Sequence, residues 1–257
     1  MDQTKCNAGR DFMKDHTRSE VDWSQTDQAR GIEAPPTEVR DPQGLTRYFL
    51  EPVEDFSSAV VRGDFLDVIE ARRSQRRFTG EKLTFSQLSA LLWATAGYRE
   101  PIRKKMRHTP SAGNRQPIET YAIVMDSEEI PAGVYRYIPS EHALDLISDQ
   151  AKDLRERSIT AAHDQVFACT CGVNIVFAAV PYRTEWRYDF AAHRVILMDV
   201  GHMGQNVYLT ATALGLGAVA IAAFDQELTD RLIGVDGQDQ FAIYMCPVGV
   251  VSQQNAE

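Results

Sequence analysis

The sequence predicts an α+β fold in which helices flank a central sheet of mixed or antiparallel strands. Three observations lead to this expectation. Short apolar runs that are typical of buried strands are dispersed along the chain, at 120–125, 173–180, 218–223 and 241–245. Helical patterns separate these runs, and two alternating segments at 133–138 and 142–147 predict a hairpin around Pro139-Ser140-Glu141. Dispersed strands with hairpin pairing fit an α+β layer fold better than a strictly alternating parallel sheet.

Composition places the chain among ordinary globular proteins. Its 257 residues are 44% hydrophobic and 25% charged, which suffices for one large domain with a sizeable core. Residues 1–55 are polar and proline-containing, and we expect them to form an extension packed on a domain at 56–257. The net charge of −9 argues against a nucleic-acid partner. No apolar run approaches about 18 residues and no signal segment is evident, so we expect a cytoplasmic protein with no membrane contact.

Spacing and capping residues define the first helices. A helical pattern begins at Asp64 and ends near Arg72. Thr84 and Gln87 have the spacing of a capping box, which predicts the start of a helix that Gly97 terminates.

Three further helices are expected in the second half of the chain. Residues 152–168 are amphipathic, and residues 226–233 form a short helical pattern between two strands. The segment 191–214 is apolar almost all round and is interrupted by Gly201 and Gly204. Such a helix belongs in a core or in a subunit interface.

Two polar stretches suggest one binding site. Residues 72–77 (Arg-Arg-Ser-Gln-Arg-Arg) place four arginines and a serine at the end of a helix, and residues 109–117 (Thr-Pro-Ser-Ala-Gly-Asn-Arg-Gln-Pro) form a turn rich in hydrogen-bonding groups. Arginine binds phosphate bidentately, while amides and turn N–H groups can bond a polar ring edge. The pair therefore fits an anion carried on a planar ring. The alternative for the first stretch is a solvated basic surface.

Other chemistries lack their motifs. The chain has no glycine-rich dinucleotide fingerprint after a strand, no Gly-x-Ser-x-Gly, no His-Glu-x-x-His and no Gly-x-x-x-x-Gly-Lys. The four cysteines show no zinc-ligand spacing. His193 and His202 lie on one predicted helix with Asp199 but do not share a face well. We therefore predict no metal site.

Five motifs in order resemble the FMN-dependent nitroreductase family. They are the two polar stretches, the helix segment 201–209 (Gly-His-Met-Gly-Gln-Asn-Val-Tyr-Leu), and the runs 88–97 and 133–137, which are similar to the SagB/ThcOx-type branch. The similarity extends from about Asp64 to Gly249. It implies a nitroreductase-like fold, an intertwined homodimer and an FMN site at the subunit interface.

The resemblance also assigns candidate cofactor-binding residues. It implies that the first stretch contacts the FMN phosphate and the polar edge of the flavin, that the second faces the ribityl chain or the ring, and that the small-residue segment 220–224 approaches the isoalloxazine. The residues concerned are Arg72, Arg73, Ser74, Arg76, Pro110, Ser111, Asn114, Ala222 and Ala223.

The candidate catalytic pair is Arg187-Tyr188. It occupies the place where azoline dehydrogenases of this branch look to carry a Lys-Tyr pair that removes a proton. Arginine stays protonated and cannot be a general base, so Tyr188 is the remaining candidate for proton transfer. The basic residue that flavin reductases of this fold carry near the C-terminus is also missing beyond Gly249. Phosphate binding then depends on residues 72–76 or on Arg103–Arg107.

These inferences predict an FMN-dependent oxidoreductase that moves a hydride between flavin and a small organic or peptide-derived substrate. Azoline-type dehydrogenation and nitro or quinone reduction, with NAD(P)H as electron donor, both remain open. The alternative is a non-catalytic flavin-binding or partner protein that keeps the fold.

Overall fold

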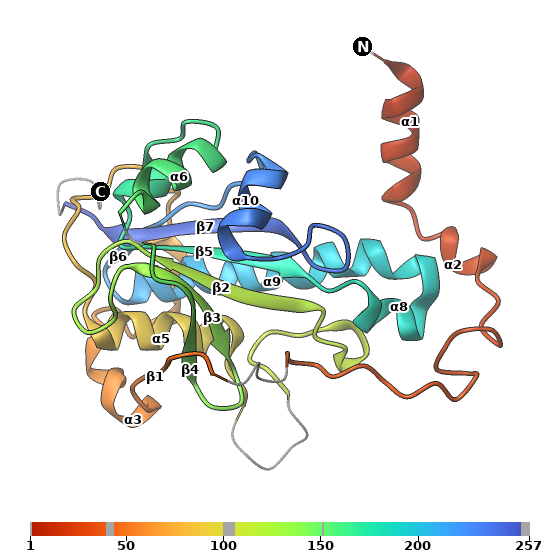
Figure 1. Ribbon diagram of the computed structural model, residues 1–257, viewed down its shortest axis with the longest axis horizontal. Coiled ribbons are helices and arrows are strands. Elements are labelled where there is room, and N and C mark those ends of the chain that lie inside the picture. Colours follow the sequence, from red (N-terminus) through yellow and green to blue (C-terminus); the bar gives the residue numbers. More distant parts are fainter. Residues whose placement is uncertain (1, 40–43, 100–105, 151, 253–257) are drawn as a thin grey trace.

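A computed structural model describes residues 2–39, 44–99, 106–150 and 152–252. Its centre is a seven-stranded sheet with the order β1-β4-β3-β2-β5-β7-β6, and every pairing of these strands is antiparallel (Figure 1). The α+β class is confirmed. No helix of the described residues is both long and apolar enough to cross a membrane.

The strands follow the predicted apolar runs closely. The hairpin of β3 with β4 is confirmed, and so are the buried strands β2 and β5, which pair along their whole length. The seven strands are β1 (Arg47–Phe49), β2 (Ile118–Val124), β3 (Gly133–Ile138), β4 (Ala143–Ser148), β5 (Val173–Ala179), β6 (Leu216–Ala218) and β7 (Phe241–Val250). The expected strand at 218–223 differs, because β6 ends at Ala218 and only Ile221 makes a further bridge, to Met245.

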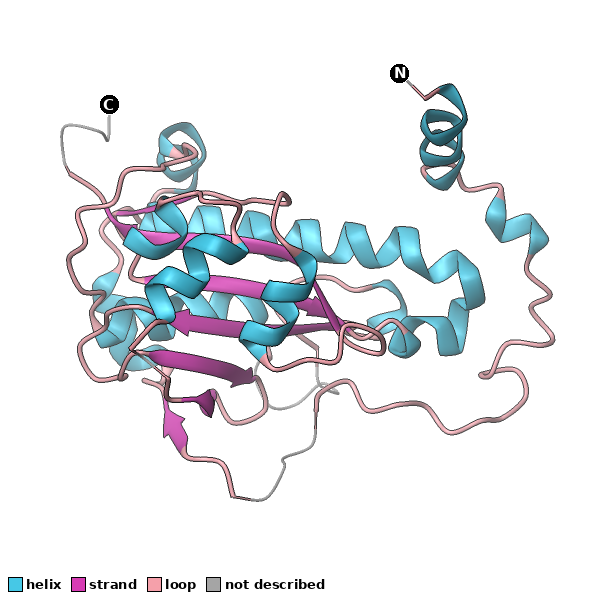
Figure 2. Cartoon of the chain, turned by 45° about the horizontal axis from the view of Figure 1, so that its top comes forward, coloured by secondary structure: helices cyan, strands magenta, loops and turns pink. Residues whose placement is uncertain are grey.

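Two hydrophobic cores lie on the two faces of the sheet, and helices cover both faces (Figure 2). Alternate residues of β5 divide between them: Ile175 and Phe177 pack in one core, while Val176 and Ala178 pack in the other. This alternation follows from the two-residue period of a strand. Helices α5 (Phe85–Ala96) and α9 (Ala192–Ala213) cover the first face, and α6 (Leu154–Ala161) and α10 (Gln226–Ile233) cover the second.

The capping and spacing predictions hold for the main helices. Thr84 and Gln87 form both bonds of a capping box at α5, and the Gly97 N–H bonds to the Trp93 carbonyl at its end. Helix α10 has the predicted bounds. Helix α9 runs through both of its glycines without a break. Gly204 permits close packing there, since a Cβ at this position would lie 2.7 Å from the Tyr244 ring.

The predicted helix at 152–168 is wrong in its length. The chain forms α6, a turn, and then the short α7 (Phe167–Thr170). The break falls at His163 and Asp164, whose φ angles of 51° and 60° lie in the left-handed region. An α-helix cannot continue through such residues.

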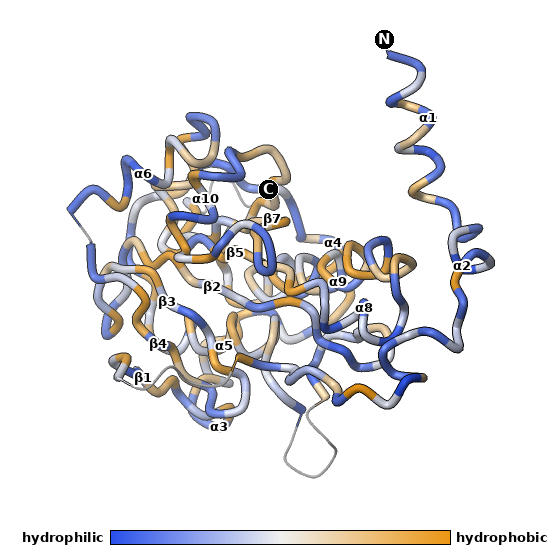
Figure 3. The backbone as a smooth tube through the Cα atoms, turned by 45° about the vertical axis from the view of Figure 1, so that its right-hand side comes forward, coloured by the Kyte–Doolittle hydropathy of each residue, from blue (hydrophilic) through white to orange (hydrophobic). Residues whose placement is uncertain are grey.

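The N-terminal segment has two parts. Helix α1 (Gln3–Phe12) has no buried residue and stands away from the sheet, and α2 (Thr17–Glu20) follows it (Figures 1 and 3). The chain then runs along α8 (Tyr182–Tyr188), where the Gln28 N–H bonds to the Trp186 carbonyl. After β1, helices α3 (Val53–Phe56) and α4 (Phe65–Ala71) lead to the arginine cluster.

Candidate functional site

The arginine cluster begins where α4 ends. Arg72 caps this helix, and Ser74 forms an isolated bridge with Ala218 of β6. The Arg72 guanidinium lies 5.3 Å from the centre of the Tyr208 ring, and the Ser74 hydroxyl is 3.0 Å from the Tyr208 hydroxyl. Helix α9 therefore holds the cluster through one side chain, Tyr208.

The charges of this cluster are not neutralised by carboxylates. Among the described residues, no ion pair involves Arg72, Arg73, Arg76 or Arg77. Arg73 donates to the Glu70 and Arg72 carbonyls at the end of α4. Arg76 and Arg77 are exposed. Four cations without counter-charges in an acidic protein create a local site for an anion.

The small-residue segment lies beside the same tyrosine. The Ala220 N–H donates to the Tyr208 hydroxyl at 2.8 Å. Ala222 and Ala223 are exposed, and their backbone N–H groups donate to no group in the described part of the chain. This backbone is open to a planar ligand, so the structure brings the 72–76 cluster and the 220–223 segment together.

The second polar stretch forms a tight loop with three residues at positive φ. Gly113, Asn114 and Gln116 have φ angles of 57°, 52° and 52°. The Gln116 N–H donates to the Ser111 hydroxyl at 2.9 Å, and the Gln116 amide donates to Asn114 Oδ1 at 2.7 Å. Pro110 is exposed at the start of the loop. The loop is thus fixed by its own side chains.

Asp199 of α9 anchors this loop. Both of its carboxylate oxygens lie 3.2 Å from the Ala112 N–H, and Ser111 also donates to it. Burial raises the pKa of Asp199, although these hydrogen bonds and His202 oppose the shift. Asp199 and Tyr208 are nine positions apart, which is about 13.5 Å along a helix. The two polar stretches are therefore held by different parts of α9.

Arg187 and Tyr188 meet the loop at Gly113. A Cβ on Gly113 would lie 2.7 Å from the Tyr188 hydroxyl oxygen and 3.1 Å from Arg187 Cδ, so only glycine fits there. The Arg187 guanidinium lies 5.5 Å from the centre of the Tyr188 ring. The structure thus places the candidate catalytic pair against the predicted cofactor-binding loop.

The other arginines of this region already have hydrogen-bond or ion-pair partners within the protein. Arg183 is buried and paired with Glu119. Arg115 donates to the Arg183 and Pro35 carbonyls and lies 4.6 Å from the centre of the Trp186 ring. Burial lowers the pKa of Arg115, and the nearby Arg187 and Arg183 charges lower it further. Arg107, from the alternative phosphate site, is buried and binds the Ile118 and Thr37 carbonyls; residues 103–105 lie outside the described residues.

Sequence reasoning missed three residues that build the site. Tyr208 is evident in the sequence only as part of the 201–209 motif, and Gly113 only as part of the 109–117 turn. Asp199 carried a detectable signal, because a carboxylate in an apolar helix needs hydrogen-bond donors.

These surroundings fit a bound flavin mononucleotide. The unneutralised arginines suit a phosphate, and the open backbone at Ala222 and Ala223 suits a planar ring with hydrogen-bond acceptors.

Comparisons with known proteins identify the family. The nitroreductase family model matches residues 69–250. A protein named as a nitroreductase in Methanocaldococcus jannaschii is 35% identical over 184 residues, which cover 71% of this chain and 89% of that protein. The trifolitoxin-processing protein TfxB of Rhizobium leguminosarum bv. trifolii is 31% identical over 142 residues, 53% of this chain but only 37% of the relative.

A solved structure extends the similarity to the fold. The crystal structure of a nitroreductase from Ralstonia eutropha matches with a TM-score of 0.66 and 26% identity, over 86% of this chain and 99% of that chain. The fold and these relatives together define a flavin-dependent oxidoreductase. The chain belongs to the nitroreductase family.

Proposed function

We propose that this protein is an FMN-dependent, SagB-like oxidoreductase that moves a hydride between flavin and a small organic or peptide-derived substrate. The observation that supports it most directly is the arginine cluster without carboxylate partners, held by Tyr208 beside an exposed small-residue backbone. We also propose that residues 1–55 serve as an extension to the domain at 56–257.

The cofactor supplies the redox chemistry when bound, and the protein supplies binding and electrostatics. Arg72, Ser74 and Arg76 would hold the phosphate, with Arg73 adding positive charge beside them. Ser111 and Asn114, following Pro110, would face the ribityl chain or the ring. Ala222 and Ala223 would present backbone N–H groups to the ring edge.

Tyr188 is the group we assign to proton transfer. Its hydroxyl makes no hydrogen bond within the described residues and faces the loop at Gly113. The Arg187 guanidinium lies over the Tyr188 ring and restricts that ring. A phenol can take part in proton transfer in azoline-type dehydrogenation, and it can deliver a proton in nitro or quinone reduction with NAD(P)H.

A homodimer is part of the proposal. Large apolar side chains are exposed on α4 and α9: Phe65 is 66% exposed, Leu66 73%, Leu197 47% and Met198 48%. Exposed apolar side chains on both helices are surface that a subunit interface would cover. A second copy packed on α4 and α9 would cover it.

The cofactor assignment is tested by purifying the protein and identifying any flavin released on denaturation. We expect a yellow protein that releases FMN, because the arginine cluster at 72–77 suits a single phosphate group and the sequence has no dinucleotide fingerprint. Released FAD, or a protein that takes up no FMN, would contradict the assignment. Sedimentation at several protein concentrations tests the dimer, and a yellow protein without any turnover would favour a non-catalytic flavin binder.

A further inference from the structure

A cavity of about 430 Å³ opens beside the candidate catalytic pair. Arg187 and Tyr188 form one side of it, and the N-terminal segment forms the other through Trp23, Thr26, Gln28 and Ala29. The nitroreductase family model begins only at residue 69. The wall opposite the catalytic pair is therefore built by a part of the chain that the family model does not include.

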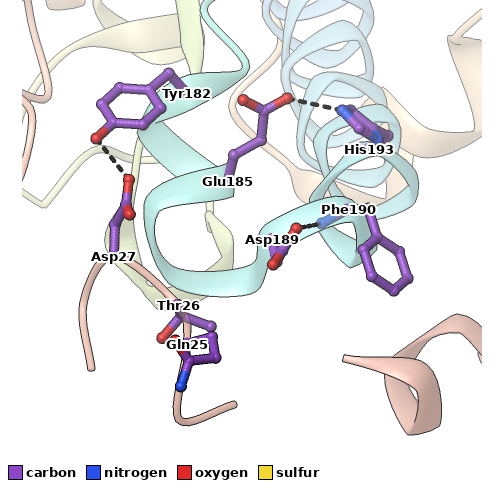
Figure 4. A pocket seen from close by; sticks show the side chains of 8 residues that line it. All are labelled: Gln25, Thr26, Asp27, Tyr182, Glu185, Asp189, Phe190 and His193. Atoms are coloured by element: carbon purple, nitrogen blue, oxygen red, sulfur yellow. Dashed lines mark hydrogen bonds and ion pairs between the residues drawn. The ribbon is translucent and has the colours of Figure 1, made fainter. Parts of the chain in front are cut away.

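The N-terminal segment is firmly attached at this place. The Gln28 N–H donates to the Trp186 carbonyl at 2.9 Å, and the Trp186 indole donates to the Ile32 carbonyl at 2.9 Å. Thr26 is buried, and the Tyr182 hydroxyl donates to Asp27 at 2.8 Å, as Figure 4 shows. Hydrogen bonds on both sides of residue 28 hold the wall in register with α8.

The lining of this cavity favours an anion. It contains an arginine, an indole, a phenol and an amide, but no carboxylate. Arg187 has no acidic partner among the described residues, and its charge together with burial lowers the pKa of the neighbouring Arg115. The pocket in Figure 4, on another side of α8, has the opposite character: Asp27, Glu185 and Asp189 line its 270 Å³. Thr26 lines both pockets, so a pocket that attracts cations adjoins the one that we interpret as attracting anions.

The same lining favours a flat ring. Trp23 is 41% exposed, and the Arg18 guanidinium lies 5.2 Å from the centre of its ring. Aromatic side chains bind planar rings through their faces, so a ligand ring would pack on the other face of Trp23. The volume is within the range of small-molecule pockets. A carboxylate bound by Arg187 would leave the ring of the same molecule between Trp23 and Tyr188.

We propose that this cavity is the substrate pocket and that it selects a planar five- or six-membered ring bearing a carboxylate, with Arg187 binding the carboxylate and Trp23 packing on the ring. This inference rests on the proposed function, since it places the substrate beside Tyr188. It assigns a specificity role to a segment that lies outside the family match at residues 69–250.

Isothermal titration of the purified holoprotein tests the proposal with two non-reacting ligands, thiazole-4-carboxylate and thiazole-4-carboxamide. We expect the carboxylate to bind about tenfold more tightly or better, because a charge-assisted hydrogen bond is lost in the amide. Arg187→Gln should bring the ratio of the two dissociation constants close to one. Trp23→Ala should weaken both ligands by about three- to tenfold and leave their ratio unchanged.

Matched variants separate these roles from general effects. Arg30→Gln removes the same charge from the N-terminal segment, where Arg30 is exposed and pairs with Asp27 outside the cavity lining, so it should keep the wild-type ratio. Trp23→Phe and Arg187→Lys should restore most of the affinity and the preference, respectively. Thermal melting confirms that each variant is folded.

The proposal is overturned if the amide binds as tightly as the carboxylate, if neither ligand binds, or if Arg30→Gln erases the preference as Arg187→Gln does. These results are distinguishable from failure of the proposed function. A yellow protein with turnover but no carboxylate preference contradicts only the pocket assignment. A protein that takes up no FMN yet still prefers the carboxylate contradicts only the cofactor assignment.

Discussion

The two ends of α9 organise two different kinds of surface. Near its C-terminal end, Tyr208 contacts Arg72, which has no carboxylate partner among the described residues, and accepts a hydrogen bond from Ala220, which precedes the open N–H groups of Ala222 and Ala223. Near its N-terminal end, Asp199 closes a loop whose polar groups bond to one another. At the first end, cationic side chains have no carboxylate partner and backbone N–H groups have no acceptor among the described residues. At the second end, the polar groups of the loop bond to one another and fix its conformation. Unpaired cations and N–H groups indicate where a charged ligand binds, and a fixed loop indicates where groups must be held in a defined position.

The largest expected effect concerns the fixed end. Tyr188→Phe removes only the hydroxyl oxygen that faces Gly113, so flavin content should remain at the wild-type level. Turnover of the native reaction should fall by about 10²–10⁴-fold if the phenol transfers a proton. Steady-state kinetics on protein of measured flavin content check this. Wild-type turnover in the variant would show that the bound cofactor and substrate suffice.

At the open end, Arg76→Ala should weaken FMN binding by about 1.5–3 kcal/mol, the contribution of a charge-assisted hydrogen bond. Arg77→Ala is the matched control, since both residues are exposed and successive side chains of an extended segment point to opposite sides. Titration of flavin fluorescence measures both. Equal losses would mean that residues 72–77 act only as a basic surface.

Local signals in the sequence were sufficient for much of the fold. The capping box at Thr84 and the bounds of α10 depend on neighbouring residues alone, so they could be predicted. The break between α6 and α7 could not, because His163 and Asp164 adopt left-handed backbone without a glycine or proline to indicate it.

The candidate site also has parts that could be predicted from the sequence and parts that could not. Its arginines form one sequence motif and were evident, whereas the contact of Tyr188 with Gly113 joins segments about 75 positions apart. The cavity wall at Trp23 lies still further from Arg187 along the chain. Tertiary packing alone brings these residues together, and no local pattern encodes it.

A smaller effect should follow from removing the hydroxyl that links three parts of the open end. Tyr208→Phe keeps the ring beneath Arg72 but leaves the Ala220 N–H and the Ser74 hydroxyl without this partner. We expect a loss of about 1–2 kcal/mol in the free energy of unfolding, measured in urea. Tyr244→Phe is the control, because the Tyr244 hydroxyl makes no hydrogen bond within the described residues. If both variants lose the same stability, Tyr208 does not organise the open end.

The smallest expected effect concerns Asp199, whose contribution to the free energy of unfolding depends on pH. Burial raises its pKa, so the folded protein binds more protons than the unfolded chain between the ordinary pKa of an aspartate, about 3.8, and the raised value. The Asp199 contribution to stability therefore falls as the pH rises through that window, and at neutral pH the buried charge costs stability.

Asp199→Asn removes the charge but keeps an acceptor for the Ala112 N–H. We expect the variant to be more stable than wild type at neutral pH, by up to about 1 kcal/mol, with the difference shrinking as the pH falls towards 4. Urea unfolding at both pH values measures it. A variant that is clearly less stable at neutral pH would mean that the charged hydrogen bonds outweigh the cost of burial. The fixed end of α9 would then depend on the carboxylate charge itself.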